Sequence, residues 1–298
     1  MQTYPRLPLI PSPLVQHFPE NEHGRDFIVA DLHGSLKLFL RALERVRFDS
    51  SRDRVFSVGD LGDRGEDSFG CLKLILEPWF FHVVGNHEDL LLTYLKLRES
   101  DRHSGSDFLP NGGGWLLNLT PAQKRTLDEV LLPKLLEAPL VIRVGVAGPA
   151  PFNLVHAELA GVDGSVLTND RLTCERVASL RARLTWGRRL LPEALEAMSS
   201  RCWNVDEILV SAQAFEPGLS LTYVGHTMLP REMLHRSHLF IDEGAYLSNK
   251  LVLREHLPTV ALLAAKGFRA ADEAEYDPST DVITAFSGLY EELFCEQT

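Results

Sequence analysis

Residues 58–68 read VGDLGDRGEDS, and this stretch indicates both the fold and the kind of site to expect. It follows RVFS at 54–57, a largely apolar run typical of a buried strand. Its eleven positions hold four acidic residues, one arginine and three glycines. Carboxylates crowded at the end of one strand repel each other unless a cation lies among them. The stretch therefore predicts a strand that delivers acidic side chains to a site for positive charge.

Similar strand-to-helix units lie on both sides of this stretch. The apolar run 27–30 is followed by residues 34–46, whose apolar side chains recur at helical spacing. Residues 80–84 form a third apolar run before the helix-like stretch EDLLLTYLKLRE. Residues 120–123, TPAQ, have the composition of a capping box with proline in the first turn, and this helix is expected to reach residue 137. Strands that alternate with helices predict an α/β fold with parallel pairing.

Five apolar runs end in side chains that bind hard or borderline metal ions. They are Asp31 and His33 in VADLHG, Asp60 in VGDLGDRG, Asn86 and His87 in VVGNHE, His156 in LVHAE, and His226 in YVGHT. Ligands of open α/β sheets bind beyond the carboxyl ends of the strands, so these side chains are expected to meet. Asp, Asn and His suit Mn, Fe or Zn, and not iron–sulfur chemistry. We expect Asp60 to bridge two such ions, and Arg64 to bind an anion that the metals also hold.

Each of these signals also has a purely structural interpretation. A histidine at a strand end can serve packing alone, Arg64 can pair with Asp67 in a Gly-rich turn, and Asn86 can cap the helix that follows it. Five strand ends would then have acquired such residues independently of one another. The combination favours a metal site.

The chain of 298 residues has a formal net charge of −11, which is unevenly distributed. Residues 270–298 contain eight acidic residues and no Lys or Arg. The sequence has no basic stripe of the kind that would indicate nucleic-acid binding. No apolar stretch approaches the roughly 20 residues of a membrane helix, and the first residues contain no apolar block of the kind found in signal peptides. The cysteines are scattered and are expected to be reduced: Cys71, Cys174, Cys202 and Cys295. These features predict a cytoplasmic protein that binds neither nucleic acid nor membranes.

The chain is expected to have three parts. Residues 1–23 are a Pro-rich arm, residues 24–256 a catalytic domain, and residues 257–298 an acidic extension. Within the extension, residues 278–295 have apolar side chains at helical spacing and are predicted to form an amphipathic helix. This helix is expected either to pack against the catalytic domain or to dock a partner or a second copy of the chain.

The segments DLHG, GDLGDRG, GNHE, HAE and GH occur in the order typical of the calcineurin-like metallophosphoesterases, which the chain resembles. GDLGDRG and GNHE are similar to those of the serine/threonine phosphoprotein phosphatases. NGGGW at 111–115 and TWGRR at 185–189 resemble the branch of the bacteriophage lambda protein phosphatase and its bacterial relatives. The resemblance covers roughly residues 25–255.

This resemblance implies a β-sandwich of mixed sheets flanked by helices on both sides, the α/β metallophosphatase arrangement. It also implies two divalent metal ions, with Mn²⁺ expected and Fe, Zn or another divalent ion as the alternative. One ion would be held by Asp31, His33 and Asp60, and the other by Asp60, Asn86, His156 and His226.

The resemblance further assigns His87 as a general acid oriented by Asp63, and Arg64 and Arg188 as phosphate ligands. The chain departs from the family pattern at Gly62, where an apolar side chain is usual. It also has Gly187 where the lambda relative has asparagine, which leaves Arg189 as the alternative to Arg188.

The implied function is hydrolysis of phosphoserine and phosphothreonine esters in a phosphoprotein or phosphopeptide, with phosphotyrosine also open. The attacking group would be a hydroxide that bridges the metals. The alternative is a symmetrical diadenosine tetraphosphate hydrolase, whose members usually carry GNHD and lack an intact D-x-x-DRG. An inactive scaffold of the same fold is a third alternative, against which every expected ligand and His87 is present.

Overall fold

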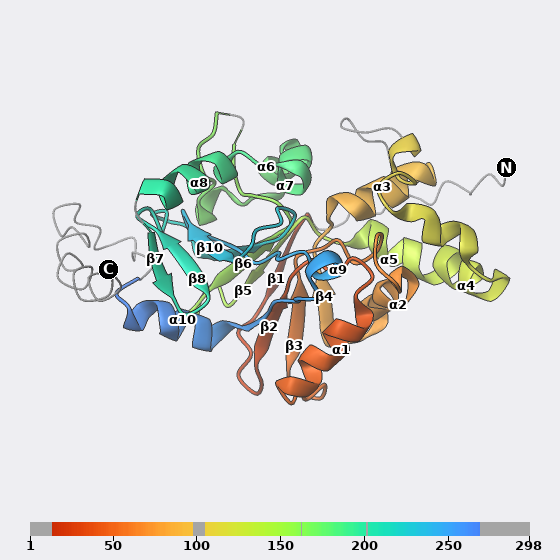
Figure 1. Cartoon of the computed structure of the whole chain (residues 1–298), viewed down its shortest axis with the longest axis horizontal. Coiled ribbons are helices and arrows are strands. Elements are labelled where there is room, and N and C mark those ends of the chain that lie inside the picture. The colour runs from red at the N-terminus through yellow and green to blue at the C-terminus, as the bar shows by residue number, and fades with distance from the viewer. Residues whose placement is uncertain (1–13, 98–104, 162, 201, 269–298) are drawn as a thin grey trace.

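The computed structural model describes residues 14–97, 105–161, 163–200 and 202–268. Its core is a pair of β-sheets (Figure 1). The smaller sheet has the order β12 (Leu253–Glu255), β2 (Asp26–Val29), β3 (Arg54–Ser57) and β4 (Phe80–His82). The larger has the order β1 (Val15–Phe18), β5 (Val141–Val144), β6 (Phe152–Val155), β9 (Leu221–Val224), β11 (His238–Phe240), β10 (Glu232–His235), β8 (Ile208–Ser211) and β7 (Cys202–Val205). Both sheets are mixed, as the resemblance implied.

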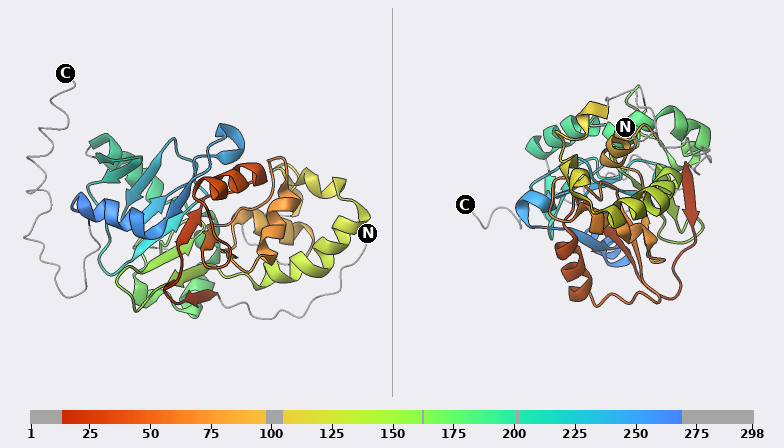
Figure 2. Two further views of the ribbon diagram at one scale, coloured as in Figure 1. Left: turned by 90° about the horizontal axis from the view of Figure 1, so that it is seen from below. Right: turned by 90° about the vertical axis from the view of Figure 1, so that its right-hand side faces the viewer.

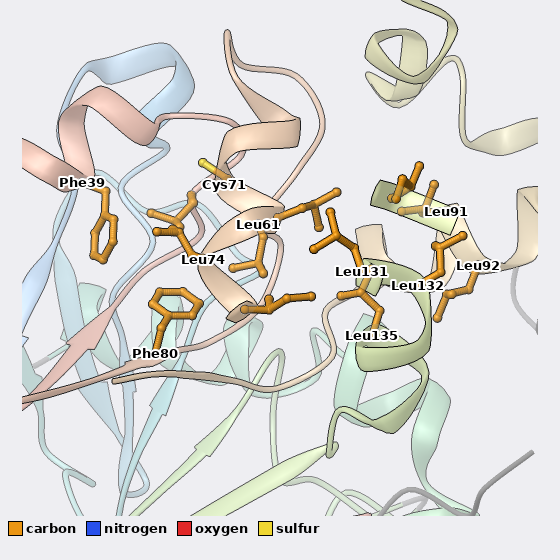
Figure 3. Close-up of a cluster of buried hydrophobic side chains, with 14 of the residues drawn as sticks. Phe39, Leu61, Cys71, Leu74, Phe80, Leu91, Leu92, Leu131, Leu132 and Leu135 are labelled. Atoms are coloured by element: carbon orange, nitrogen blue, oxygen red, sulfur yellow. The ribbon is translucent and has the colours of Figure 1, made fainter. Parts of the chain in front are cut away.

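Three hydrophobic clusters hold four layers together. Phe56 and Ile28 of the small sheet pack with Phe152 and Tyr223 of the large sheet, which makes the two sheets a sandwich. The other face of the small sheet is covered by α1 (Leu36–Arg45), α2 (Ser68–Lys73), α3 (Asn86–Tyr94) and α5 (Leu132–Glu137). Phe39, Leu61, Leu74, Phe80 and Leu135 belong to that cluster, which Figure 3 shows.

The outer face of the large sheet is covered by α6 (Cys174–Ser179), α7 (Arg181–Trp186) and α8 (Leu190–Ser200). Figure 2 shows the orange to yellow-green helices at one end of the molecule and the blue helix α10 (His256–Ala265) at the other. The prediction of helices on both sides is thus confirmed. No helix in the described part of the chain combines the length and the apolar character that crossing a membrane requires.

The three predicted strand-to-helix units form the small sheet. β2, β3 and β4 are parallel, whereas β12 comes from the far end of the domain and pairs antiparallel with β2. The helix predicted from residue 120 is present as α4 (Pro121–Thr126), a π-helical turn (Leu127–Leu131) and α5, with Thr120 and Gln123 in a capping box. Pro133 lacks the N–H that would continue the α-helical bonding pattern there.

Parts of the predicted arm and extension belong to the folded body. Residues 15–18 form β1, a parallel edge strand that pairs with β5, and Pro19 follows the last paired residue. Residues 256–265 form α10 (His256–Ala265), whose His256 Nδ1 lies 3.0 Å from the Tyr223 hydroxyl in the sandwich core. The helix predicted at 278–295 lies outside the described residues.

Candidate dinuclear metal centre

The five polar strand ends meet at one edge of the sandwich. Asp31, Asp60 and Asn86 follow β2, β3 and β4 of the small sheet, and His156 and His226 follow β6 and β9 of the large sheet. The site therefore lies where the two sheets adjoin. All the expected metal ligands are buried: Asp31, His33, Asp60, Asn86, His156 and His226.

Glycines let these turns approach each other. A Cβ atom on Gly85 would overlap Asp60 Oδ1, and one on Gly225 would overlap Asp31 Oδ1. Two ligands that follow a glycine are also constrained, since Asp60 after Gly59 and His226 after Gly225 have φ angles of 51° and 63°. Non-glycine residues rarely adopt this left-handed backbone. The recurrent sequence V-G followed by a ligand is thus the local signature of the site.

The ligand atoms form two clusters around Asp60. His33 Nε2 lies 3.5 Å from Asp60 Oδ2 and 4.0 Å from Asp31 Oδ2. On the other side, His156 Nε2 lies 3.4 Å from Asp60 Oδ1. Asp60 therefore presents one carboxylate oxygen to each cluster, which is the placement of a bridging ligand. Two groups of side chains lie close enough together to hold a metal ion: His33, Asp60 and His87 on one side, and Asp60, His156 and His226 on the other.

The hydrogen bonds around the imidazoles fix which nitrogen faces the centre. His33 Nδ1 donates to the Gly62 carbonyl at 3.0 Å, and His156 Nδ1 donates to the Val58 carbonyl at 2.8 Å. Each ring is left with its Nε2 lone pair directed at the clusters, as in metal-binding histidines. A Cβ atom at Gly62 would meet only ordinary contacts, so the position has room for a side chain and does not require glycine.

The donor set fits a cation. Asn86 Oδ1 lies 2.8 Å from both His156 Nε2 and His226 Nδ1, so one amide oxygen and two ring nitrogens converge. Burial opposes charge on His156, but the Asp60 carboxylate raises the pKa of His156 to about 10, so a metal ion on Nε2 would displace a proton and use the lone pair that it leaves. Burial and Asp242 raise the pKa of Asp31 well above its usual range. A divalent ion would satisfy these lone pairs and remove the repulsion between the carboxylates.

Two structural alternatives from the sequence are wrong. Asn86 is the first residue of α3 and not its cap, and its side chain points to the two histidines. Asp67 accepts a hydrogen bond from Gly70 N and caps α2. Arg64 instead donates to His33 Nε2 at 3.0 Å and lies over the ring of Tyr246, with its guanidinium carbon 5.1 Å from the ring centre.

His87 is oriented by a chain of two hydrogen bonds. Its Nδ1 lies 2.6 Å from Asp63 Oδ2, and Trp115 Nε1 donates to Asp63 Oδ1, also at 2.6 Å. His87 Nε2 is buried, has no hydrogen-bond partner among the described residues, and lies 3.9 Å from Asp60 Oδ2. This nitrogen is free to serve a reacting group.

The two candidate arginines diverge. Arg188 is exposed, and its Nη2 donates to the His226 carbonyl at 3.4 Å. The guanidinium of Arg189 lies against Gly164, where a Cβ atom would overlap it. Of the two neighbours, Arg188 is the one beside the metal centre.

Sequence reasoning missed four residues that support the centre. Glu88 accepts hydrogen bonds from the backbone N–H groups of residues 60, 61 and 85 at 2.8–2.9 Å, which ties two ligand turns together. Glu158 accepts from the N–H groups of residues 189 and 190 at 2.9 and 2.8 Å and so sets the start of α8. The others are Trp115 and the buried Asp242.

A local signal existed for three of these four residues. Glu88 and Glu158 are the last letters of GNHE and HAE, and Asp242 ends an apolar run, HLFID, in the manner of the metal ligands. Trp115 ends the segment NGGGW, but it lies 52 positions from its partner Asp63, and no local pattern relates the two.

Comparisons with known proteins agree with this geometry. Residues 27–150 match the family model "Calcineurin-like phosphoesterase". The chain is 27% identical over 243 residues to serine/threonine-protein phosphatase 1 of Salmonella typhimurium, covering 82% of this chain and 97% of the relative. It is 24% identical to serine/threonine-protein phosphatase 2 of Escherichia coli, covering 81% of this chain and 97% of that protein.

Other similar proteins carry a different name. A symmetrical bis(5'-nucleosyl)-tetraphosphatase of Actinobacillus succinogenes is 43% identical, but only over 68 residues, which are 22% of this chain and 25% of that one. The crystal structure of a putative diadenosine tetraphosphatase superposes with a TM-score of 0.50 and 20% identity, covering 82% of this chain and 94% of the other, which shows a shared fold. From its fold, its clustered ligands and these relatives, the chain carries a calcineurin-like metallophosphoesterase domain.

Proposed function

We propose that this protein is a phosphomonoesterase that uses two divalent metal ions to hydrolyse phosphoserine and phosphothreonine esters in proteins. The observation that carries the proposal is the position of His87 beside the bridging carboxylate of Asp60, with Nδ1 on Asp63 and Nε2 free. An alkoxide is a poor leaving group and needs a proton donor at this position.

The metal assignment follows the two ligand clusters. Asp31, His33 and Asp60 would hold one ion, and Asp60, Asn86, His156 and His226 the other. The oxygen and imidazole donors suit Mn²⁺, which we propose as the metal. Bound divalent ions would make the attacking water acidic and offset charge on the phosphate.

The side chains of the chain perform the remaining tasks. Asp63 and Trp115 hold His87 so that Nε2 can protonate the departing oxygen. Arg64 and Arg188 approach the centre from different elements, and each guanidinium can donate two hydrogen bonds to phosphate oxygens. A metal ion bound to His33 Nε2 would displace the hydrogen bond from Arg64 to that nitrogen. The guanidinium would then be available to the phosphate.

The choice of phosphoproteins rests on the relatives that align over most of both chains, which are named serine/threonine-protein phosphatases. Dinucleoside tetraphosphate hydrolysis is the second candidate. It is favoured by the 43% identity to a tetraphosphatase, confined to 68 residues, and weakened by the intact GDLGDRG and GNHE.

The test is a comparison of kcat/KM on one preparation, made metal-free and reloaded with Mn²⁺. The substrates are matched phosphoserine, phosphothreonine and phosphotyrosine peptides and diadenosine tetraphosphate. We expect the phosphoserine and phosphothreonine peptides to be preferred, and the metal-free protein to be inactive. Preference for the dinucleotide would establish the second candidate, and full activity without metal would contradict both.

His87→Asn tests the acid within the same assay. It should lower kcat by roughly 10²–10⁴-fold on phosphopeptides, and less on p-nitrophenyl phosphate, whose leaving group needs no proton. The metal content, measured by elemental analysis, should stay the same. A loss of metal would instead make His87 a ligand.

A further inference from the structure

A groove of about 820 Å³ lies between α1 and the segment that leads into β12. Leu38 and Ala42 of α1 line one wall, and Leu251 and Val252 line the other. The second wall is the segment that joins α9 (Ala245–Ser248) to α10, drawn in blue in Figure 1. We call this feature the α1–β12 groove. These four apolar side chains, which we call its apolar floor, can contact the apolar side chains of a partner.

Basic side chains surround this floor. Arg41, Arg45, Arg231 and Lys250 line the groove, are exposed, and form no ion pair with a described carboxylate. Arg41 and Arg45 are four positions apart and thus share one face of α1.

The other charged groups of the groove do not cancel these four cations. Arg254 Nε lies 2.8 Å from Glu232 Oε2, and Arg254 Nη2 lies 3.7 Å from Glu207, so this one cation faces two carboxylates and leaves one negative charge. Glu243 is the remaining acidic side chain of the lining, so five basic and three acidic side chains leave two net positive charges. The groove is therefore locally positive on a protein whose net charge is −11.

The C-terminal segment of this chain has the complementary chemistry. Residues 270–298 carry eight acidic residues and no Lys or Arg. Within them, an apolar stripe at helical spacing is formed by Val282, Phe286, Leu289 and Leu293, with acidic neighbours at Asp281, Glu291, Glu292 and Glu296. An apolar face bordered by carboxylates matches an apolar floor bordered by arginines.

The last described residue is close enough to the groove. Phe268 packs against Trp203 of β7, with ring centres 5.8 Å apart, and the turn after β7 carries Glu207 of the groove lining. Trp203 and Glu207 are four positions apart in the sequence, or about 13 Å of extended chain. The residues between Phe268 and residue 278 can span about 33 Å. We propose that residues 278–295 dock as an amphipathic helix in the α1–β12 groove of the same chain.

The test uses the full chain and carbodiimide, which joins a lysine amine to a carboxylate through an amide bond. Lys250 is the lysine of the groove lining. Trypsin releases residues 270–298 as one peptide, because no Lys or Arg follows Arg269. We expect mass spectrometry to find this peptide linked to Lys250, and not to the exposed Lys134 of α5.

Two variants should abolish the Lys250 link: Arg41→Glu with Arg45→Glu in the groove, and Phe286→Asp with Leu289→Asp in the tail. The matched control, Arg125→Glu with Arg171→Glu, reverses two exposed arginines outside the lining and should keep the link. The tail variant leaves the described body unchanged, so it tests docking even if the groove variant misfolds.

Mixing ¹⁴N- and ¹⁵N-labelled protein identifies the donor of the tail. Links within one isotope support the proposal. Mixed-isotope links would mean that a second copy occupies the groove, and would overturn it. It would also be overturned by links spread equally over Lys250 and Lys134, or by a Lys250 link that survives both variants. An added acidic peptide that labels Lys250 while the tail does not would assign the groove to another partner.

Discussion

Trp115 acts on the reaction only through Asp63 and His87. Its indole N–H donates to Asp63 Oδ1, so Trp115→Phe removes one hydrogen bond and keeps most of the ring. Losing this hydrogen bond should weaken the positioning of Asp63 and His87 by about 1–1.5 kcal/mol. We therefore expect kcat to fall by roughly tenfold, with KM and metal content unchanged. The loss should shrink on p-nitrophenyl phosphate, which depends less on His87.

Trp79→Phe is the control for this substitution, because Trp79 packs with Phe48 and Phe80 away from the centre. Steady-state kinetics of both variants on one phosphopeptide check the prediction. Equal effects of the two substitutions would mean that Trp115 contributes only packing.

Arg188 and Arg189 form a natural matched pair, since they are adjacent and both exposed. Arg188→Ala removes a guanidinium beside His226 and should raise both KM and the inhibition constant of inorganic phosphate by roughly tenfold or more. Arg189→Ala should change neither, because that side chain lies against Gly164. The inverse result would transfer the phosphate-binding role to Arg189.

The sequence predicts the site best within a single turn, where the residues that matter are adjacent in the chain. The V-G-ligand turns were predictable from the sequence. Both of their features, a glycine and a polar residue after an apolar strand, lie within a few adjacent residues. The partners of those residues were not, because Glu158 acts on α8 and Trp115 acts across 52 positions. Asp242 fits the strand-end pattern, but HLFID is not among the motifs that carry the resemblance.

At the scale of elements, β11 carries a histidine that must stay neutral. Leu159 N donates to His238 Nε2 at 3.0 Å, and His238 Nδ1 donates to the Arg236 carbonyl at 2.8 Å, so no site for a second proton remains. Burial lowers the pKa of His238 to about 4. The unfolded chain, with an ordinary pKa near 6.5, therefore takes up the proton first.

Stability from His238 is complete above pH 6.5 and is lost as the pH falls from there towards 4. Between pH 7 and pH 5 this group should cost about 2 kcal/mol of unfolding free energy. His238→Gln should lose that part of the pH dependence, measured by urea denaturation of metal-free protein at both values. His23→Gln, at an exposed position, should retain it. Equal slopes in all three proteins would contradict the assignment.

The arrangement of elements was predictable only in part. The three parallel strands and their helices follow one another along the chain, and their periodicity specified them. The order of the large sheet depends on contacts between distant segments, as when β9 pairs with both β6 and β11. β1 was obscured by flanking prolines, which suggested an arm.

For the whole molecule, the ligands come from positions 31 to 226 and meet only when both sheets are in place. Metal should therefore bind the folded state and raise its stability by mass action. At a free Mn²⁺ concentration one hundred times Kd, one site contributes about 2.7 kcal/mol. We expect the melting temperature to rise with Mn²⁺ and to fall with chelator. His156→Asn should respond less, and a melting temperature insensitive to Mn²⁺ in the unmodified protein would contradict a site that spans the two sheets.

The antiparallel strand β12 has a consequence for how the chain is made. The parallel strands of the small sheet are complete by residue 82, yet the open side of β2 receives its partner only at residues 253–255. During synthesis, most of the chain emerges while that edge still has unpaired N–H and C=O groups, a template for joining strands of other molecules. A product that stops short of residue 253 would keep this edge for its lifetime. Such fragments should aggregate even though every parallel strand of the small sheet is present.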